Sequence, residues 1–117
     1  MELIGESKLF LNNGKSSVLV RVREIVRCES KGNSTTFYFN TMENFVVSKT
    51  IKEYDYLLKP LGFLRTHQSH LVNMSKIKRF YKGEELKVMM DNGDLVPVSQ
   101  RRKEVVLREM KNQEFIL

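Results

Sequence analysis

The stretch LKVMMDNGDLVPV, Leu86–Val98, contains the pattern that decides the fold. Apolar and polar residues alternate through its first part, as they do in a strand with one buried face. Asp91-Asn92-Gly93 then interrupts the apolar residues, and Asn-Gly between two apolar runs is a strong signal of a hairpin turn. The stretch therefore predicts two antiparallel strands, at Leu86–Met90 and Leu95–Val98.

Seven further segments have the same character: they are short, rich in β-branched or aromatic residues, and separated by polar turn signals. They predict strands at Lys8–Leu11, Ser17–Val20, Ile25–Glu29, Thr35–Asn40, Phe45–Ser48, Phe63–Arg65 and Lys78–Tyr81. Phe37 and Phe39 fall on one face of their strand. The pattern predicts a mainly β domain, although strand spacing alone does not separate a barrel from stacked sheets.

Two short helices are also predicted. The first begins after Thr50, because Thr50 and Glu53 have the spacing of a capping box, in which the threonine side chain accepts from the Glu53 amide. Pro60 ends this helix. The second helix runs from near Ser99 toward Met110. The predicted buried face of the first helix consists of Ile51, Tyr54, Leu57 and Leu58.

The length and composition fit a single domain. The chain has 117 residues, of which 41% are hydrophobic and 29% charged, which is enough for one buried core. Its apolar runs are too short to span a bilayer, and its first residues lack the pattern of a secretory signal. Because Cys28 is the one cysteine, no intrachain disulfide can form. We therefore expect a reducing, cytoplasmic location and no membrane partner.

The charge is high and unevenly distributed. The net charge is +6 and the pI is about 9.6. No acidic residue lies between Arg65 and Lys82, and a second basic cluster occupies residues 101–103. Clustered cations of this kind are typical of proteins that bind nucleic acid or an anionic membrane, although a solvated cationic face has the same composition. The cations of the first cluster are Arg65, Lys76, Lys78, Arg79 and Lys82.

The segment FLRTHQSHLVN, Phe63–Asn73, places six polar residues in a row. Its two histidines are the only ones in the chain, and no carboxylate accompanies them, so we expect no metal site. No acid orients a histidine and no glycine-rich loop follows, so we expect no enzyme and no cofactor. If the segment is extended, His67 and Ser69 share one face while Gln68 and His70 share the other.

Two interpretations of this segment remain. His67 and Asn73 flank apolar residues that are expected to be buried, and could satisfy loop backbone groups in a buried network. Alternatively, the segment is part of a nucleic-acid surface, since Gln68 can pair with adenine through two hydrogen bonds. Residues 30–35 (SKGNST) and 98–103 (VSQRRK) combine the same amide, hydroxyl and cationic groups. Three such loops in a basic domain favour the nucleic-acid surface.

At this point a family resemblance is evident. FLRTHQSHLVNMSKIKRF (residues 63–80) resembles the central signature of the LytTR family, the DNA-binding output domain of many bacterial response regulators. IVRCESKGNSTTFYF (25–39), VSKTIKEYDYLLKPLGF (47–63) and DNGDLVPVSQRRKEVVLREM (91–110) resemble further family motifs, in the same order. The resemblance covers nearly the whole chain, so we expect residues 1–117 to form one LytTR-like domain, with residues 1–7 as a linker.

The resemblance implies a fold of stacked antiparallel sheets with little helix. It also implies that loops enter successive major grooves of double-stranded DNA and read direct repeats, with two copies of the protein bound as a homodimer. Family members usually carry a receiver domain ahead of this one, as part of a two-component phosphorelay. The chain has no room for a receiver domain, so it is expected to be either an output domain cut from a longer regulator or a stand-alone regulator.

The resemblance assigns DNA contacts residue by residue. The first loop corresponds to Lys31, Asn33, Ser34 and Thr35; the second to Gln68, with Ser69 on phosphate; the third to Gln100, with Arg101 and Lys103 beside it. Arg65 and His67 are expected to anchor the second loop and to contact phosphate. Some members have a base-reading histidine in the first loop and an arginine in the third, and this chain departs from both. Because glutamine favours adenine where arginine favours guanine, the base preference should differ. The alternative is a basic interaction module that binds RNA or an acidic protein.

Overall fold

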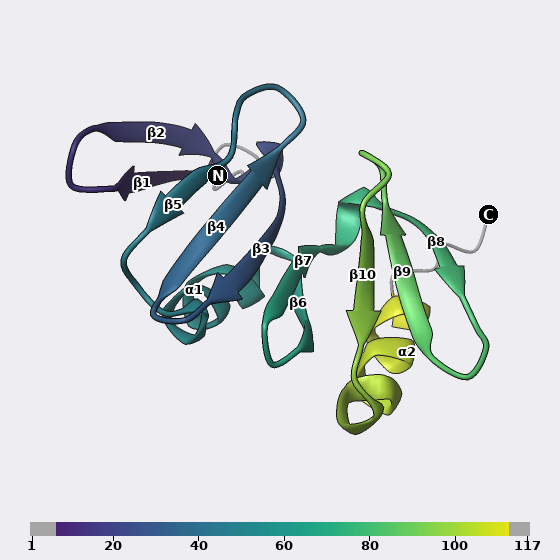
Figure 1. Ribbon diagram of the computed structural model, residues 1–117. Helices are drawn as coiled ribbons and strands as arrows, with labels where there is room; N and C mark the ends of the chain where they lie inside the picture. The colour runs from purple at the N-terminus through teal and green to yellow at the C-terminus, as the bar shows by residue number, and fades with distance from the viewer. Residues whose placement is uncertain (1–6, 113–117) are drawn as a thin grey trace.

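The computed structural model describes residues 7–112, which form three antiparallel sheets and two α-helices (Figure 1). The strands are β1 (Lys8–Asn12), β2 (Ser17–Arg21), β3 (Ile25–Lys31), β4 (Ser34–Phe39), β5 (Phe45–Val47), β6 (Phe63–His67), β7 (His70–Asn73), β8 (Ile77–Tyr81), β9 (Leu86–Met90) and β10 (Leu95–Val98). The helices are α1 (Ile51–Leu58) and α2 (Lys103–Asn112). The predicted mainly β fold is confirmed. Apart from Ser7, the linker predicted at residues 1–7 lies outside the described residues.

The sheets follow one another along the chain. A hairpin of β1 and β2 comes first, a five-stranded sheet of order β5-β4-β3-β7-β6 follows, and a three-stranded sheet of order β10-β9-β8 comes last. The short strand β7 pairs with both β3 and β6, so it connects β6 to the rest of the five-stranded sheet. Figure 1 shows β6, at the edge of this sheet, beside β10 of the next.

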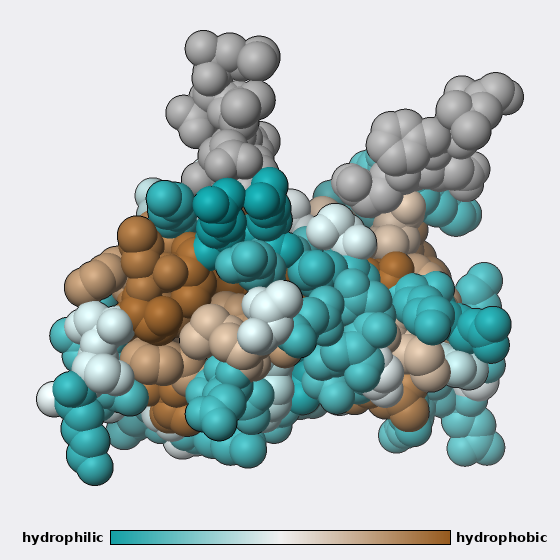
Figure 2. Space-filling view, turned by 90° about the horizontal axis from the view of Figure 1, so that it is seen from above, coloured by the Kyte–Doolittle hydropathy of each residue, from teal (hydrophilic) through white to brown (hydrophobic). Residues whose placement is uncertain are grey.

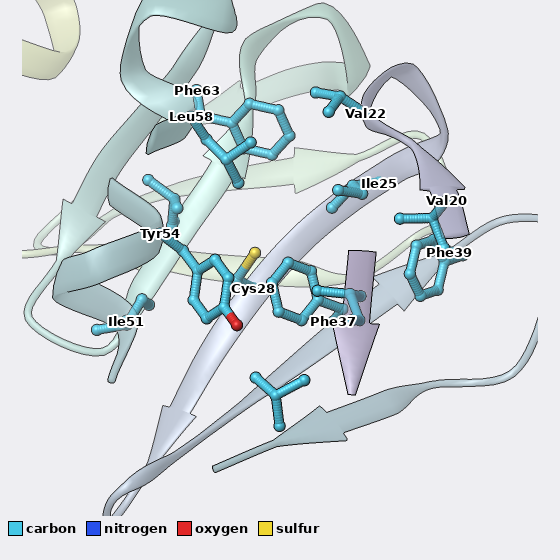
Figure 3. Packing of buried hydrophobic residues seen from close by; sticks show 13 residues of the cluster. Val20, Val22, Ile25, Cys28, Phe37, Phe39, Ile51, Tyr54, Leu58 and Phe63 are labelled. Carbon is cyan, nitrogen blue, oxygen red and sulfur yellow. The ribbon is translucent and has the colours of Figure 1, made fainter. Parts of the chain in front are cut away.

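The first of two apolar clusters packs α1 and the β1–β2 hairpin against the five-stranded sheet (Figure 3). Phe37 of β4 meets Tyr54 of α1 edge to face, with ring centroids 4.8 Å apart. Phe39 belongs to the same cluster, which confirms that Phe37 and Phe39 share a face. Ile25 and Cys28 of β3 also point into this cluster.

The second cluster lies between the five-stranded and the three-stranded sheets. Val26, Leu64 and Val72 pack there against strands β9 and β10 and against Val106 of α2. A register shift between Ile25 and Arg27 marks a β-bulge in β3, which lets Ile25 and Cys28, three positions apart, both face the first cluster while Val26 faces the second. The five-stranded sheet is therefore the middle layer of the domain.

Two details predicted for the helices are wrong. The Thr50 side chain does not cap α1; its backbone carbonyl accepts from Glu53 N at 3.2 Å instead. Leu57 is 50% exposed, because a helix with 3.6 residues per turn places Leu58, not Leu57, in line with the buried residues before it. The helix does end before Pro60, and α2 begins at Lys103, later than predicted. A 3-10 turn, η5 (Gln100–Arg102), occupies the intervening positions.

The polar segment around the histidines is a hairpin, and this changes the faces assigned to it. The strand predicted to end at Arg65 continues as β6 to His67, turns at Gln68 and Ser69, and returns as β7, which was not predicted. His67 and His70 therefore face each other across the turn. The faces predicted for an extended segment are wrong, because alternation holds only while the chain keeps its direction.

Candidate nucleic-acid interface

The three loops predicted to contact DNA lie at one edge of the molecule. They connect β3 to β4, β6 to β7, and β10 to α2, and all three are at the lower edge of Figure 1. We call this surface the loop edge and define it as Lys31–Ser34, Gln68–Ser69 and Ser99–Lys103. The structure thus brings together segments that are far apart in the sequence.

Backbone hydrogen bonds fix the three loops relative to one another. Ser30 N donates to Ser69 O at 2.8 Å, which joins the first loop to the second. Ser99 N donates to Thr66 O at 2.9 Å, which joins the third loop to the strand that leads into the second. Because Thr66 is fully buried, this link is shielded from water. The loop edge is therefore a continuous, braced surface.

Arg65 stabilises the second loop from beneath. Its Nε donates to His67 O at 3.1 Å and its Nη2 to Gln68 O at 2.6 Å, while Nη1 bonds to Asp55 Oδ2 of α1 at 3.1 Å. The Arg65 side chain is 14% exposed, so most of its guanidinium faces protein. These contacts support the anchoring role expected for Arg65 and leave the Gln68 side chain exposed at the tip.

The two histidines close the same hairpin. Ser69 N donates to His67 Nδ1 at 3.0 Å. The His67 and His70 rings lie edge to face, with centroids 5.3 Å apart. Burial lowers the pKa of His70; the carboxylate of Glu29 opposes this shift, and Arg27 and His67 add to it. His70 Nδ1 is buried without a hydrogen-bond partner among residues 7–112.

The first loop is a tight turn with an exposed tip. Gly32 has a φ of 61°, a conformation that glycine adopts at little cost. Lys31 and Asn33 are exposed, and Ser34 Oγ donates to Lys31 O at 2.9 Å. Thr35 does not belong to the surface as predicted: it is fully buried, and its hydroxyl donates to the carbonyl of residue 49 at 2.7 Å. Its position at the start of a buried strand face explains this difference.

The third loop concentrates positive charge. Gln100, Arg101 and Lys103 are exposed, whereas Arg102 is half-buried. Burial lowers the pKa of Arg102; the nearby Arg65 and Arg101 lower it further, and Asp55 opposes them. A cleft of about 730 Å³ between α1 and α2 is lined partly by Arg65 and Arg102. Asp55 and Glu109 line the same cleft, and Asp55 pairs with Arg65 there.

Two residues of this region were not predicted as part of the site. Arg102 lies within the basic cluster of residues 101–103, so composition pointed to it without assigning it a role. Asp55 had no signal in the sequence, since its contact with Arg65 joins a helix to a strand ten positions later.

Asn73 belongs to the buried network that was one of the two interpretations. It is 4% exposed, its Nδ2 donates to Ile25 O at 2.9 Å, and its Oδ1 accepts from Ser75 N at 3.1 Å. Within the described part of the chain, no cluster of three or more His, Cys, Asp or Glu residues could hold a metal ion. No helix among residues 7–112 is long and apolar enough to cross a membrane.

The loop edge contains no large exposed apolar side chain among the residues that the structure describes. Phe10 and Leu19, 66% and 58% exposed, are paired across the β1–β2 hairpin instead. Figure 2, viewed from the end opposite the loop edge, shows apolar residues gathered on the side of that hairpin. The loop edge is thus polar and cationic, which suits a polyanion.

Comparison with known proteins agrees with this geometry. The LytTr DNA-binding domain family matches residues 15–111 of the chain. A solved structure, the LytTr DNA-binding domain of a protein described as a methyl-accepting/DNA response regulator from Bacillus cereus, is 28% identical, with a TM-score of 0.76. The match covers 91% of this chain and 97% of that one. No curated protein matches the chain. The chain belongs to the LytTr DNA-binding domain family, which is non-catalytic and typical of response-regulator output domains.

Proposed function

We propose that the chain binds double-stranded DNA in a sequence-specific manner through its loop edge, as the output domain of a bacterial two-component response regulator. The observation that carries this proposal is the placement of three exposed amide side chains, Asn33, Gln68 and Gln100, one on each hydrogen-bonded loop. Asparagine and glutamine can pair with adenine through two hydrogen bonds in the major groove. The family and the described role of the solved relative support the same function.

Other groups of the loop edge are suited to the DNA backbone. Hydroxyls and cations beside the amides would bind phosphates and fix the register without reading the sequence. Arg65 and His67 would act mainly by holding the second loop, and Thr35 is omitted because it is buried. The proposed phosphate contacts are Lys31, Ser34, Ser69, Arg101 and Lys103.

The arrangement on DNA follows from the family resemblance. We propose that the loops enter successive major grooves and that two copies bind a direct repeat as a homodimer. In a full-length regulator, a receiver domain ahead of this one would control binding through a phosphorelay in the bacterial cytoplasm.

Selection of bound duplexes from a random pool tests the function directly. The expected result is an enriched motif that occurs twice in the same orientation. Binding without any enriched motif, together with equal or tighter binding of RNA or single strands, would instead support a general basic interaction module.

Paired variants test the assignment of the loop edge. Gln68→Ala should reduce discrimination at one base pair by about 1–3 kcal/mol, whereas Lys103→Ala should weaken all sequences alike. Fluorescence anisotropy with the selected duplex and its single-base variants measures both effects. Lys15→Ala is the matched control, since Lys15 is an exposed cation in the turn between β1 and β2. If neither test variant differed from Lys15→Ala, the loop edge would not be the DNA surface.

A further inference from the structure

Arg27 is an arginine held between the two larger sheets. It follows the β-bulge of β3, and its side chain is 10% exposed. Its Nε donates to Asp94 Oδ2 at 2.9 Å, and Asp94 comes directly before β10 of the three-stranded sheet. Its Nη1 donates to Glu29 Oε1 at 2.8 Å, and its guanidinium lies 3.8 Å from the centre of the Tyr38 ring.

These contacts outweigh the cost of burying the charge. Burial alone would lower the pKa of Arg27, but the hydrogen bonds to Glu29 and Asp94 raise it above its usual value. Burial likewise opposes ionisation of Glu29, yet the hydrogen bond from Arg27 lowers the pKa of that carboxyl. The guanidinium is planar with donors at fixed angles, so both carboxylates must keep their positions to be satisfied. Arg27 thus links the sheets with a defined geometry.

The link lies at the end opposite the loop edge. In Figure 1 the β9–β10 turn is at the top of the molecule and the three loops are at the bottom. Asn40 Nδ2 donates to Asp91 Oδ1 at 3.1 Å, which adds a second contact at the upper end. At the lower end the sheets are joined by the bond from Ser99 N to Thr66 O. Two separated attachments fix the angle between the sheets, whereas one would act as a hinge.

Apolar packing alone does not supply this restraint. The second cluster fills the space between the sheets, but the hydrophobic effect is non-directional and depends on the area removed from water. A small rotation of one sheet preserves most of that area, while it moves Asp94 out of line with the guanidinium. The ion pair of Arg27 and Asp94 therefore restrains the angle between the two sheets.

We propose that Arg27, through Asp94, is a positioning residue that sets the orientation of the third loop relative to the second. The first and second loops belong to the five-stranded sheet and the third follows the three-stranded sheet. The bond from Ser99 N to Thr66 O holds the start of the third loop against β6, so a change in the angle between the sheets tilts the third loop about this bond. The tilt changes the spacing of the base pairs that Gln68 and Gln100 can contact. The proposal rests on the proposed DNA binding and adds to it a determinant of site spacing that makes no DNA contact.

The test compares DNA sites of altered spacing. The duplex selected by the native chain is compared with duplexes carrying one base pair inserted or deleted between the positions read by Gln68 and Gln100. For the native chain each alteration should weaken binding roughly tenfold, as expected for a lost base contact. Asp94→Ala should bind the altered sites nearly as well as the selected one. The milder variant Asp94→Asn should lose less of this discrimination than Asp94→Ala and more than the native chain. Unchanged discrimination in Asp94→Ala would overturn the proposal.

A control separates positioning from general destabilisation. Val47→Ala removes buried methyl groups from the first cluster, away from the contact between the sheets, so it should lower stability and keep the native spacing preference. Equal loss of preference in Val47→Ala and Asp94→Ala would show a merely structural role for Asp94.

Residual dipolar couplings supply a measurement without DNA. In Asp94→Ala, strands β8–β10 should have a changed orientation relative to β3–β7, or an orientation averaged by motion. In Val47→Ala the orientation should be native. An unchanged orientation in Asp94→Ala would overturn the proposal even if the native chain bound no DNA. Absence of binding by the native chain, with an altered orientation in Asp94→Ala, would contradict the proposed function and leave the role of Asp94 in sheet geometry supported.

Discussion

Cys28 is fully buried in the first cluster, between β3 and α1. Burial raises the pKa of its thiol, and the nearby charge of Arg27 only partly opposes this. Since the thiolate is the reactive form, Cys28 behaves as a small apolar residue rather than as a nucleophile. At this scale the environment of a side chain, not its type, decides its chemistry.

His70 makes stability depend on pH. Burial lowers its pKa in the folded state below the ordinary 6.5, so the unfolded chain binds more protons in mildly acidic solution. Its contribution is fully present above about pH 6.5 and is lost as the pH falls toward the folded-state pKa. As the pH falls below about 6.5, urea unfolding should show a falling free energy of unfolding, by at most about 1.4 kcal/mol per pH unit from this group.

The variant His70→Gln checks the origin of this effect. It removes the titrating ring and should flatten the pH dependence. Glu29 does not interfere in this range, because its lowered pKa places its titration at more acidic pH. A native-like pH dependence in His70→Gln would assign the effect to another group.

The β6–β7 hairpin turns on two residues, neither of which is glycine. Two-residue hairpin turns favour backbone conformations with positive φ, yet no residue other than glycine has positive φ in the described chain. A register shift between Arg65 and His67 and the side-chain bonds of these two residues accompany the turn instead. The β6–β7 hairpin, which carries Gln68 at its turn, is therefore stabilised by the side chains of Arg65 and His67.

Arg65→Lys tests this support. Lysine keeps the charge, but its three donors are on one nitrogen and cannot reach two carbonyls and Asp55 together. The free energy of unfolding should therefore fall by about 1–3 kcal/mol. The amide resonances of Gln68 and Ser69 should shift in NMR spectra. Arg79→Lys is the matched control, since Arg79 is exposed on β8. Native stability and unshifted amide resonances in Arg65→Lys would contradict the anchoring role.

The elements differ in how far the sequence predicted them. Alternation and turn residues located nine of the ten strands, with Leu86–Met90 and Leu95–Val98 matching the structure at both ends. β7 was missed because it is short and bounded by His70 and Asn73, so only its two central residues have strand character. Its place is instead determined by pairing with β3, from a distant part of the chain. Patterns within one segment contain no information about such pairing.

Three exposed cations of the molecule lie on the loop edge. The net charge is +6, but only Lys31, Arg101 and Lys103 combine exposure with a place on the loop edge. If each neutralises one phosphate, the logarithm of affinity should fall with the logarithm of salt concentration with a slope of about −2.7 per bound copy. Lys103→Ala should reduce the magnitude of this slope by about 0.9. Salt titrations by anisotropy give both values, and a slope near zero would exclude these phosphate contacts.

At this scale the sequence identified the components of the site but not their assembly. Composition singled out the three loops, and the resemblance named their residues. The bonds that join the loops, from Ser30 to Ser69 and from Ser99 to Thr66, connect residues distant in sequence and leave no local pattern. The same holds for burial of Thr35, which depends on the layer packed over its strand.

The pairing of Arg27 with Asp94 also constrains the order of folding. The two residues are 67 positions apart, so the guanidinium lacks this partner until the last hairpin is in place. If the five-stranded sheet were covered before then, the Arg27 guanidinium would be removed from water without its partner Asp94. Docking of the final sheet and dehydration of Arg27 must therefore occur together. During synthesis, the Arg27 side chain therefore stays hydrated until Asp94 has left the ribosome and can pair with it.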